Sequence, residues 1–476
     1  AYAPLVSIVV PIYNTPADLL EKMVGSVKRQ AYEKWELCLV DDASPQPHVR
    51  PLLEQVAARD PRIRVTFRAS NGNISAATNT GIAVARGEFI AFLDHDDELT
   101  PDALLEVVRV LNDEPDTDVV YTDQDKIDLE GRRSEPFYKP AWSPAYLESV
   151  MYVGHLLVVR ASVLADVGGC DGTFDGVQDF ELMLRLGEAT KKIRHLPKIL
   201  YHWRMIPGSI ASDVSAKKGI VDLQRHAVQA HLDRLGIKAL ATTSGTAHRV
   251  RVVPAARSHE PLVSIMIPSR DHPELIGPCL ASLFEKTTYK TFEVIVGDNE
   301  TSDPEALRLF DRYPVTRVPL PGKFCFAAFN NRMAEKARGD YLLLLNNDTE
   351  VVQPDWLETL MLYAEQDDVG AVGPMLLYGD GTVQHAGVIL GPRGTADHVM
   401  RGFPGDSDGY AGSLQAAREV TAVTGACLLV RRDHYMACGG LNETFGRHYE
   451  DVDFCLRLRR LGLRNIFVGG ARMVHH

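Results

Sequence analysis

Short apolar runs alternate with amphipathic stretches along the first 112 residues of the chain. Four runs are strand-like, and the last of them, 89–93, is apolar at every position, which is typical of a strand buried on both faces. They cover residues 6–10, 37–40, 63–67 and 89–93. The stretches between and after them place apolar residues at helical spacing, over 16–29, 49–59, 75–86 and 101–112. This alternation predicts an α/β fold with right-handed crossovers and a mostly parallel central sheet, covered by helices on both faces.

The same pattern occurs twice in the chain. Three of the segments that return in the same order are PLVSIVVPIYN as PLVSIMIPSRD, ELCLVDDAS as EVIVGDNET, and QDFELMLRL as EDVDFCLRL. Matches that keep their order indicate a tandem duplication. We therefore expect two domains, 1–235 and 261–476, joined by a linker at 236–260 that is rich in Ala, Thr, Ser and Gly.

A proline and several acidic residues follow directly after the predicted strands. Pro11 follows the first strand, Asp41 and Asp42 follow the second, and four acidic residues crowd into 94–98 after the fourth. In parallel sheets the carboxyl ends of the strands lie on one edge, where ligands bind. For Asp41 and Asp42 alone, two roles stay open. They can bond their own loop backbone, or they can accept hydrogen bonds from a nucleotide base or ribose.

The acidic cluster carries the strongest chemical signal. Asp94 and Asp96 lie in LDHDDEL, and the second copy has Asn346 and Asp348 at the matching positions in LNNDTEV. An acidic turn can simply cap the following helix at Thr100. Its presence in both copies, beside the other edge residues, favours a site for Mg²⁺ or Mn²⁺. These ions bind carboxylates and complete their coordination with phosphate oxygens.

Two further pairs of residues recur at matching positions. Asp179 and Asp451 each begin an amphipathic helix. An aspartate there is often only a partner of the helix dipole, but in a cleft it can act as general base for a hydroxyl. His202 and His475 lie at the ends of late strands, where a histidine is either satisfied within the core or binds a metal. The residues alone leave both alternatives open.

Composition narrows the class of protein. With 45% hydrophobic and 24% charged residues, the 476-residue chain is typical of globular proteins, and a net charge of −12 argues against a nucleic-acid partner. The seven cysteines include no C-x-x-C pair, which favours free thiols in a reducing compartment. No apolar run approaches the roughly 20 residues of a membrane helix, and no signal peptide is visible. We therefore expect a cytoplasmic location, including peripheral association with the inner face of the membrane. The chain opens without an initiator Met, so segments beyond its ends can carry membrane or partner contacts.

The motifs together resemble the family-2 glycosyltransferases, which have the GT-A fold. Those that carry the resemblance are VSIVVPIYN, LVDDAS, NGNISAATNTGIAVARGEFIAFLDHDD, QDFELMLR and YHWR, with their counterparts in the second copy. The resemblance implies that Asp179 and Asp451 are the catalytic bases. It also implies one Mn²⁺ or Mg²⁺ per domain, held by Asp96 with His202 and by Asp348 with His475. The implied nucleotide-binding residues are Pro11, Tyr13, Asp41, Asp42, Asn79 and Asp94 in the first copy and Pro268, Arg270, Asp298, Asn299, Asn331 and Asn346 in the second.

The implied reaction is an inverting displacement. A base removes the proton of an acceptor hydroxyl while a nucleoside diphosphate leaves the sugar. The NND and YEDVDFCLR forms resemble bacterial rhamnosyltransferases. We therefore expect a bifunctional enzyme that uses a nucleotide-sugar donor, dTDP-rhamnose or a UDP-sugar, to extend a surface polysaccharide such as O-antigen or capsule. The expected acceptor is a glycan, including a lipid-linked one. The alternative is a polysaccharide-binding or scaffolding protein in which one or both copies are inactive.

Overall fold

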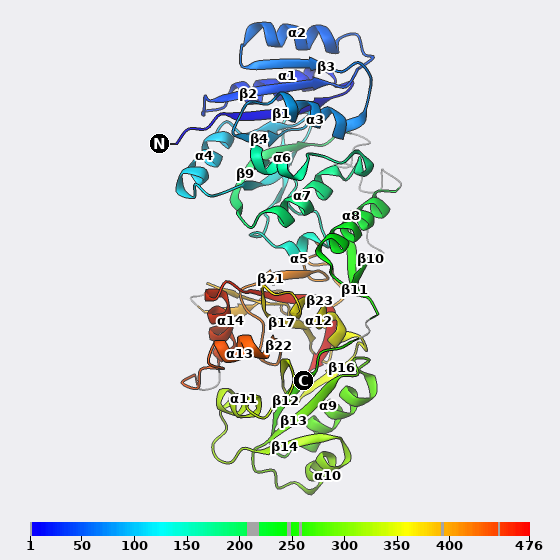
Figure 1. Ribbon diagram of the computed structural model, residues 1–476, viewed down its shortest axis with the longest axis vertical. Helices are drawn as coiled ribbons and strands as arrows, with labels where there is room; N and C mark the ends of the chain where they lie inside the picture. Colours follow the sequence, from blue (N-terminus) through cyan, green and yellow to red (C-terminus); the bar gives the residue numbers. More distant parts are fainter. Residues whose placement is uncertain (1, 207–218, 245–248, 257–258, 392–394, 446–447) are drawn as a thin grey trace. The chain divides into compact units, whose positions relative to one another are not determined.

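The chain divides into two compact units, each with its own α/β architecture (Figure 1). We call them domain 1 (Ala1–Ile237 and Ala241–Arg251) and domain 2 (Lys238–Leu240 and Val252–His476). The computed structural model describes residues 2–206, 219–244, 249–256, 259–391, 395–445 and 448–476. Across these ranges, no helix combines the length and the hydropathy that crossing a bilayer requires.

Domain 1 is built on a nine-stranded sheet. Its strands are β1 (Val6–Ile12), β2 (Trp35–Asp41), β3 (Ile63–Phe67), β4 (Phe89–Phe92), β5 (Glu98–Leu99), β6 (Val119–Ile127), β7 (Arg133–Phe137), β8 (Leu157–Arg160) and β9 (Ile193–Arg204). They are ordered β3-β2-β1-β4-β8-β6-β9-β5, with β7 beside β6. The first four strands are parallel, and β8 runs antiparallel to both β4 and β6. The four strands predicted from the apolar runs are all present.

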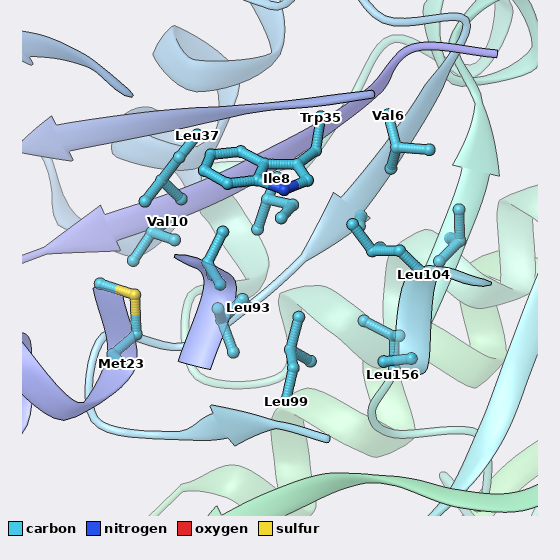
Figure 2. Close-up of a cluster of buried hydrophobic side chains, with 14 of the residues drawn as sticks. Val6, Ile8, Val10, Met23, Trp35, Leu37, Leu93, Leu99, Leu104 and Leu156 are labelled. Atoms are coloured by element: carbon cyan, nitrogen blue, oxygen red, sulfur yellow. The ribbon is translucent and has the colours of Figure 1, made fainter. Parts of the chain in front are cut away.

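The helices of domain 1 cover both faces of this sheet. They are α1 (Ala17–Lys28), α2 (Val49–Arg59), α3 (Asn73–Val84), α4 (Ala103–Asp113), α5 (Pro144–Leu147), α6 (Ala161–Val167), α7 (Gln178–Ala189) and α8 (Ile220–Leu235). Ile8 and Val10 of β1 point toward Met23 of α1 and Leu104 of α4, in one buried cluster (Figure 2). Val9 points to the opposite face, where α3 packs so closely that a Cβ at Gly81 would collide with it. Successive residues of β1 therefore serve two hydrophobic layers.

Domain 2 repeats the sheet strand for strand. Its main strands are β12 (Val263–Ser269), β13 (Phe292–Asp298), β14 (Val315–Pro319), β15 (Tyr341–Leu345), β16 (Thr349–Val351), β17 (Val369–Leu377), β22 (Cys427–Arg431) and β23 (Arg464–His475). They are ordered β14-β13-β12-β15-β22-β17-β23-β16, which is the order of domain 1. β18 (Val383–His385) pairs with β17 as β7 pairs with β6, and three short strands are added, β19 (Val388–Leu390), β20 (Ala396–His398) and β21 (Ala417–Val420). The fold class predicted from the sequence, two tandem α/β domains, is confirmed.

The helices of domain 2 follow the same plan. They are α9 (Pro273–Lys286), α10 (Pro304–Arg312), α11 (Phe326–Ala334), α12 (Trp356–Ala364), α13 (Arg432–Ala437) and α14 (Glu450–Arg460). The segment predicted as a linker, 236–260, contains β10 (Ala239–Thr243) and β11 (Val250–Pro254), which pair as a two-stranded sheet. It is therefore partly regular rather than an extended connection.

Candidate active sites

Each domain has a cavity beyond the carboxyl ends of its first parallel strands. In domain 1, two adjoining hollows of about 650 and 400 Å³ share Pro11, Asp94 and Asp96 in their walls. In domain 2 the cavity has a volume of about 930 Å³. The predicted site residues that line these cavities are Pro11, Tyr13, Asp42, Asp94, Asp96 and Asp179 in domain 1 and Pro268, Arg270, Asn346, Asp348, Asp451 and His475 in domain 2. Twelve predicted residues thus meet at the edges where the sequence places them.

The acidic loop of domain 1 is held by a buried arginine that the sequence analysis passed over. Arg204 is fully buried, and its guanidinium donates to the carbonyl oxygens of Asp96 (2.7 Å) and Asp128 (2.9 Å) and to the carboxylate of Glu98. Its backbone N–H donates to Oδ1 of Asp97 at 2.7 Å. Arg204 therefore offsets part of the repulsion within this loop.

Asp97 belongs to the interior rather than to the cavity. Its side chain is fully buried, and its Oδ2 accepts a hydrogen bond from the Tyr201 hydroxyl at 2.5 Å. Burial, together with the nearby charges of Asp94 and Asp96, raises the pKa of Asp97 well above its usual value. Of the crowded acids in this loop, Asp94 and Asp96 are the two that face the cavity.

The structure contradicts the predicted role of His202 as a metal ligand. Glu98 lies opposite His202 in the sheet, whereas Thr349, the counterpart of Asp97, lies opposite His475. The register counterpart of His475 is therefore Trp203, which lines the cavity. A shift of one residue turns a strand side chain to the other face. His202 is buried instead, with its Nδ1 2.5 Å from Oδ1 of Asp125.

The two domains share this register, because β23 bulges opposite β17 at the same place where β9 bulges opposite β6. The pairing shifts on either side of Asp123, so that residues of β9 bulge out before Tyr201. A bulge of this kind re-aims the side chains that follow it. Because the bulge has the same length in both domains, Tyr201 corresponds to Met473, and the matching of LYHW to MVHH is offset from the true register by one residue.

In domain 2, Asp348 and His475 form a pair that suits a divalent cation. Oδ1 of Asp348 is buried and has no hydrogen-bond partner among the described residues, and it lies 3.1 Å from Nε2 of His475. Nδ1 of His475 lies 2.5 Å from Oε1 of Gln384, whose Nε2 donates to the carbonyl oxygen of His475. This amide orientation places the imidazole proton on Nδ1 and leaves a lone pair on Nε2. A carboxylate oxygen and an imidazole lone pair that face each other fit a shared metal ion.

The cavity walls of domain 1 offer a different set of donors. Asp96 and His95 face each other, with Oδ1 and Nδ1 3.7 Å apart, and Nε2 of His155 lies 3.6 Å from Oδ2 of Asp94. Among the residues described, no three His, Cys, Asp or Glu side chains are arranged as a ready-made metal site in either domain. A cation in these cavities would therefore depend on one or two side chains together with ligands from the substrate.

The two candidate bases occupy matching positions. Asp179 begins α7 and lines the same cavity as Asp94 and Asp96. Burial raises the pKa of Asp179 above its usual value, although the imidazole of His155 acts in the opposite direction. Asp451 begins α14 and accepts hydrogen bonds from the backbone N–H groups of Gly425 and Val452, both at 2.8 Å. These bonds hold the Asp451 carboxylate in a fixed orientation at the cavity wall.

The two aspartates after the second strand, Asp41 and Asp42, make different contacts. Asp42 lines the cavity and accepts hydrogen bonds from Arg68 at 2.5 Å and from the Gly72 N–H at 3.1 Å. Asp41 lies outside the described lining, and its Oδ1 accepts from the Ser44 N–H in its own loop. Of this pair, Asp42 is the residue that lines the cavity.

In domain 2 the corresponding residues both stay outside the lining of the cavity. Asp298 accepts from the guanidinium of Arg317 at 2.7 Å, and Asn299 donates to the carbonyl oxygens of Leu320 and Gly322. Burial alone would raise the pKa of Asp298, but the hydrogen bonds from Arg317 and Thr301 outweigh it and hold the pKa below its usual value. These hydrogen bonds engage the side chains of Asp298 and Asn299 in stabilising the turn.

Asn79 and Asn331 are a correction to the predicted nucleotide-binding set, because both bond to the backbone of a distant loop. Asn79 accepts from the N–H of Cys170 and donates to its carbonyl oxygen, both at 2.8 Å. Asn331 makes the same pair of bonds, both 2.9 Å, with Leu441. The repeated asparagine therefore fixes α3 or α11 to the loop that leads toward the base aspartate. The recurrence of this asparagine in both copies indicates that it is important, but it does not distinguish a structural role from a binding role.

Two histidines at the cavity walls were missed. His155 precedes β8 and lies where domain 2 has Ala426, since Leu157 and Leu428 pair with matching residues of β4 and β15. Burial lowers the pKa of His155 to about 4, against the opposing charge of Asp179. His398 lies in the added strand β20 and lines the cavity of domain 2. Alignment of HLLVVR with ACLLVR would have drawn attention to His155, whereas His398 has no counterpart to compare.

Comparison with known proteins gives the family. The model of glycosyl transferase family 2 matches residues 7–168 and 264–437, once in each domain. Over 99% of its length the chain is 41% identical to the O-antigen biosynthesis protein RfbC of Myxococcus xanthus and 40% identical to the uncharacterized protein y4gI of Sinorhizobium fredii. It spans about a third of the first relative (37%) and about half of the second (53%).

Partial matches extend to other polymer-forming enzymes and to solved structures. Chondroitin synthase of Escherichia coli is 32% identical over 49% of this chain and 34% of its own length. A crystal structure of S. aureus TarS 1–349 in complex with UDP-GlcNAc is 19% identical with a TM-score of 0.39, covering 48% of this chain and 66% of that chain. The family-model matches cover both domains and well over half of the sequence. The chain belongs to glycosyl transferase family 2.

Proposed function

We propose that the chain transfers sugars from nucleoside-diphosphate sugars to a glycan acceptor, with one site in each domain. The observation that supports this most is the pairing of an acidic loop with a base candidate in both cavities. Asp96 and Asp179 line the same cavity in domain 1, and Asp348 and Asp451 line the cavity of domain 2. Displacement of a diphosphate by a hydroxyl needs these two kinds of group within reach of one sugar.

The aspartate of each site acts on the acceptor. Asp179 or Asp451 would accept the proton of the attacking hydroxyl as its oxygen forms a bond to the anomeric carbon and the bond from that carbon to the diphosphate breaks. Attack from the face opposite the leaving group inverts the configuration. The backbone N–H groups of Gly425 and Val452 hold the Asp451 carboxylate for this role.

A divalent cation, Mn²⁺ or Mg²⁺, completes the proposal. Asp348 and His475 would hold it in domain 2, and Asp96 with Asp94 would do so in domain 1. Bound there, the cation would neutralise the charge that develops on the departing diphosphate. The mannosyltransferase PcManGT from Pyrobaculum calidifontis has been solved in complex with GDP-Man and Mn²⁺.

The names of the relatives support a proposal for the pathway. RfbC is named for O-antigen biosynthesis, and chondroitin synthases are named for a glycan polymer. We propose that this chain extends a bacterial surface polysaccharide from dTDP-rhamnose or a UDP-sugar. The acceptor would be lipid-linked, at the cytoplasmic face of the membrane. The units 1–235 and 261–476, joined by 236–260, would be the two catalytic domains.

Calorimetry tests this function directly. UDP, dTDP and GDP are titrated into the full chain with Mn²⁺ present and again with EDTA. We expect metal-dependent binding of one nucleotide type at two sites per chain. Asp96→Ala and Asp348→Ala should each remove one of the two sites. If the wild type binds at one site only, the variant that abolishes binding identifies the domain that holds this site. If none of the three nucleotides binds in a metal-dependent way, the proposal is wrong.

A further inference from the structure

Domain 2 contains an insertion that reaches its cavity. The connection between β17 and β22 spans 49 residues (378–426), whereas the corresponding connection between β6 and β8 spans 29 (128–156). The longer connection supplies β18, β19 and β20, of which the last two pair as a small sheet. It brings two histidines together, because Nδ1 of His385 lies 2.7 Å from Nδ1 of His398.

The hydrogen bonds of His385 fix where its proton resides. Its side chain is fully buried, and its Nε2 accepts a hydrogen bond from the Gly387 N–H at 3.3 Å. Burial holds the pKa of His385 well below its usual value, so the ring is neutral at pH 7. A neutral ring that accepts at Nε2 carries its proton on Nδ1. His385 therefore donates to His398.

The same reasoning identifies which ring nitrogen of His398 carries its proton. Its Nδ1 accepts from His385, so a neutral His398 carries its proton on Nε2. In the part of the chain that the structure describes, this Nε2 has no hydrogen-bond partner, and it is not sealed from solvent. His398 lines the cavity together with Asp451, and the carboxylate of Asp451 is among the charges that act on it. His398 and Asp451 therefore share this cavity and lie close enough for their charges to interact.

The strand β18 orients two of the histidines that line the cavity of domain 2, His475 and His398, and in opposite senses. Gln384 accepts the proton of His475 Nδ1 and leaves a lone pair on Nε2. His385, the next residue, donates to Nδ1 of His398 and leaves a proton on Nε2. One imidazole thus offers a lone pair beside Asp348, and the other offers a hydrogen-bond donor near the base.

We propose that the Nε2–H of His398 is a fixed hydrogen-bond donor to a hydroxyl oxygen of the sugar bound in the cavity of domain 2, and that His385 is the residue that positions this proton. The inference rests on the proposed function, which puts the sugar between the diphosphate near Asp348 and the base Asp451. Domain 1 has no counterpart of β20 among its described residues, so the two sites differ in how they recognise their sugars.

The first experiment measures the tautomer without any ligand. Ring ¹⁵N NMR of histidine-labelled protein at pH 7.5 should show His398 protonated on Nε2, with its signal assigned by loss in His398→Gln. His385→Asn retains an N–H donor and should preserve this tautomer, whereas His385→Leu should release it to a mixture. A wild-type His398 protonated on Nδ1 would overturn the inference, whether or not nucleotides bind.

The second experiment measures recognition of the sugar in full-length chain carrying Asp96→Ala, so that domain 2 alone titrates. Removing one hydrogen bond by His398→Leu should weaken binding of the nucleotide sugar about 5- to 10-fold and leave binding of the matching nucleoside diphosphate within about twofold. His398→Gln, which keeps an N–H donor, should recover most of the loss. Equal weakening of both ligands, or no weakening of either, would overturn the role of His398. If neither ligand binds before His398 is changed, the proposed function fails instead, and the NMR result still decides the tautomer.

Discussion

Replacing Asn79 by alanine separates two explanations of a residue that recurs in both domains. The sequence motif predicts that Asn79 binds the nucleotide, whereas the structure has both of its amide atoms bonded to the backbone of Cys170. In Asn79→Ala the N–H and the carbonyl group of Cys170 lose their partners. Cys170 is only 8% exposed, so water restores these bonds poorly.

The size of the effect follows from those two groups. Leaving one buried backbone donor or acceptor unpaired costs about 1–3 kcal/mol, so we expect Asn79→Ala to destabilise domain 1 by about 2–5 kcal/mol. Gly169, which precedes Cys170, has φ +72°, and a Cβ there would collide with Oδ1 of Asn79. The loop is therefore shaped around this side chain and has little freedom to find new partners.

Urea denaturation with peptide-resolved hydrogen exchange measures the loss and assigns it to a domain. Asn331→Ala should produce a comparable loss confined to domain 2, since Asn331 makes the same bonds to Leu441. Asn71→Ala, at the exposed rim of the domain 1 cavity, is the control and should change stability by less than about 1 kcal/mol. An Asn79→Ala protein with unchanged stability and more than about tenfold weaker nucleotide binding would refute the structural explanation.

Four other substitutions, used in three tests, probe separate parts of the structure. Asp451→Asn should lower transfer at domain 2 at least about 100-fold with nucleotide affinity unchanged, measured by product formation and calorimetry; retained transfer would exclude Asp451 as base. His475→Ala should weaken Mn²⁺-dependent nucleotide binding by about tenfold or more, whereas His202→Ala should leave that of domain 1 within about twofold; equal losses would restore His202 as a ligand. Hydrogen bonds from His231 and Arg234 outweigh the effect of burial and hold the pKa of Glu188 at about 2. Because this folded-state pKa lies below the unfolded value, the stabilisation is present above about pH 4.5 and is lost as pH falls toward 2. Glu188→Gln should therefore cost about 1–2 kcal/mol at pH 7, after allowance for solvent screening, and much less at pH 3; equal costs at both pH values would contradict this linkage.

The sequence predicted the part of the fold that depends on regular spacing. The strands β1 to β4, with helices between them, follow from apolar periodicity, and the carboxyl-edge rule correctly brought Asp96 and Asp348 into cavities with their base candidates. The antiparallel insertion of β8 was beyond prediction, because it depends on pairing between distant segments rather than on local pattern.

The errors in the predicted site have equally specific causes. His202 was misassigned because the shared histidine letter aligned LYHW with MVHH one residue away from the register of the strands, which only the pairing of β5 and β16 reveals. Asn79 was misassigned because a repeated polar residue has the same signature whether it binds a ligand or a backbone. His398 was missed because it lies in an insertion that one copy lacks, so the repeat provided no comparison.

The shared register of β9 and β23 also has a consequence for how the two domains diverge. Trp203 and Arg204 of domain 1 stand where domain 2 has His475 and His476, so the ends of these strands differ by substitution and not by length. Domain 1 places a permanent positive charge there, which holds the acidic loop, whereas domain 2 places an imidazole beside Asp348. We expect substitutions at these two neighbouring positions, rather than length changes, to separate the metal requirements of the two domains.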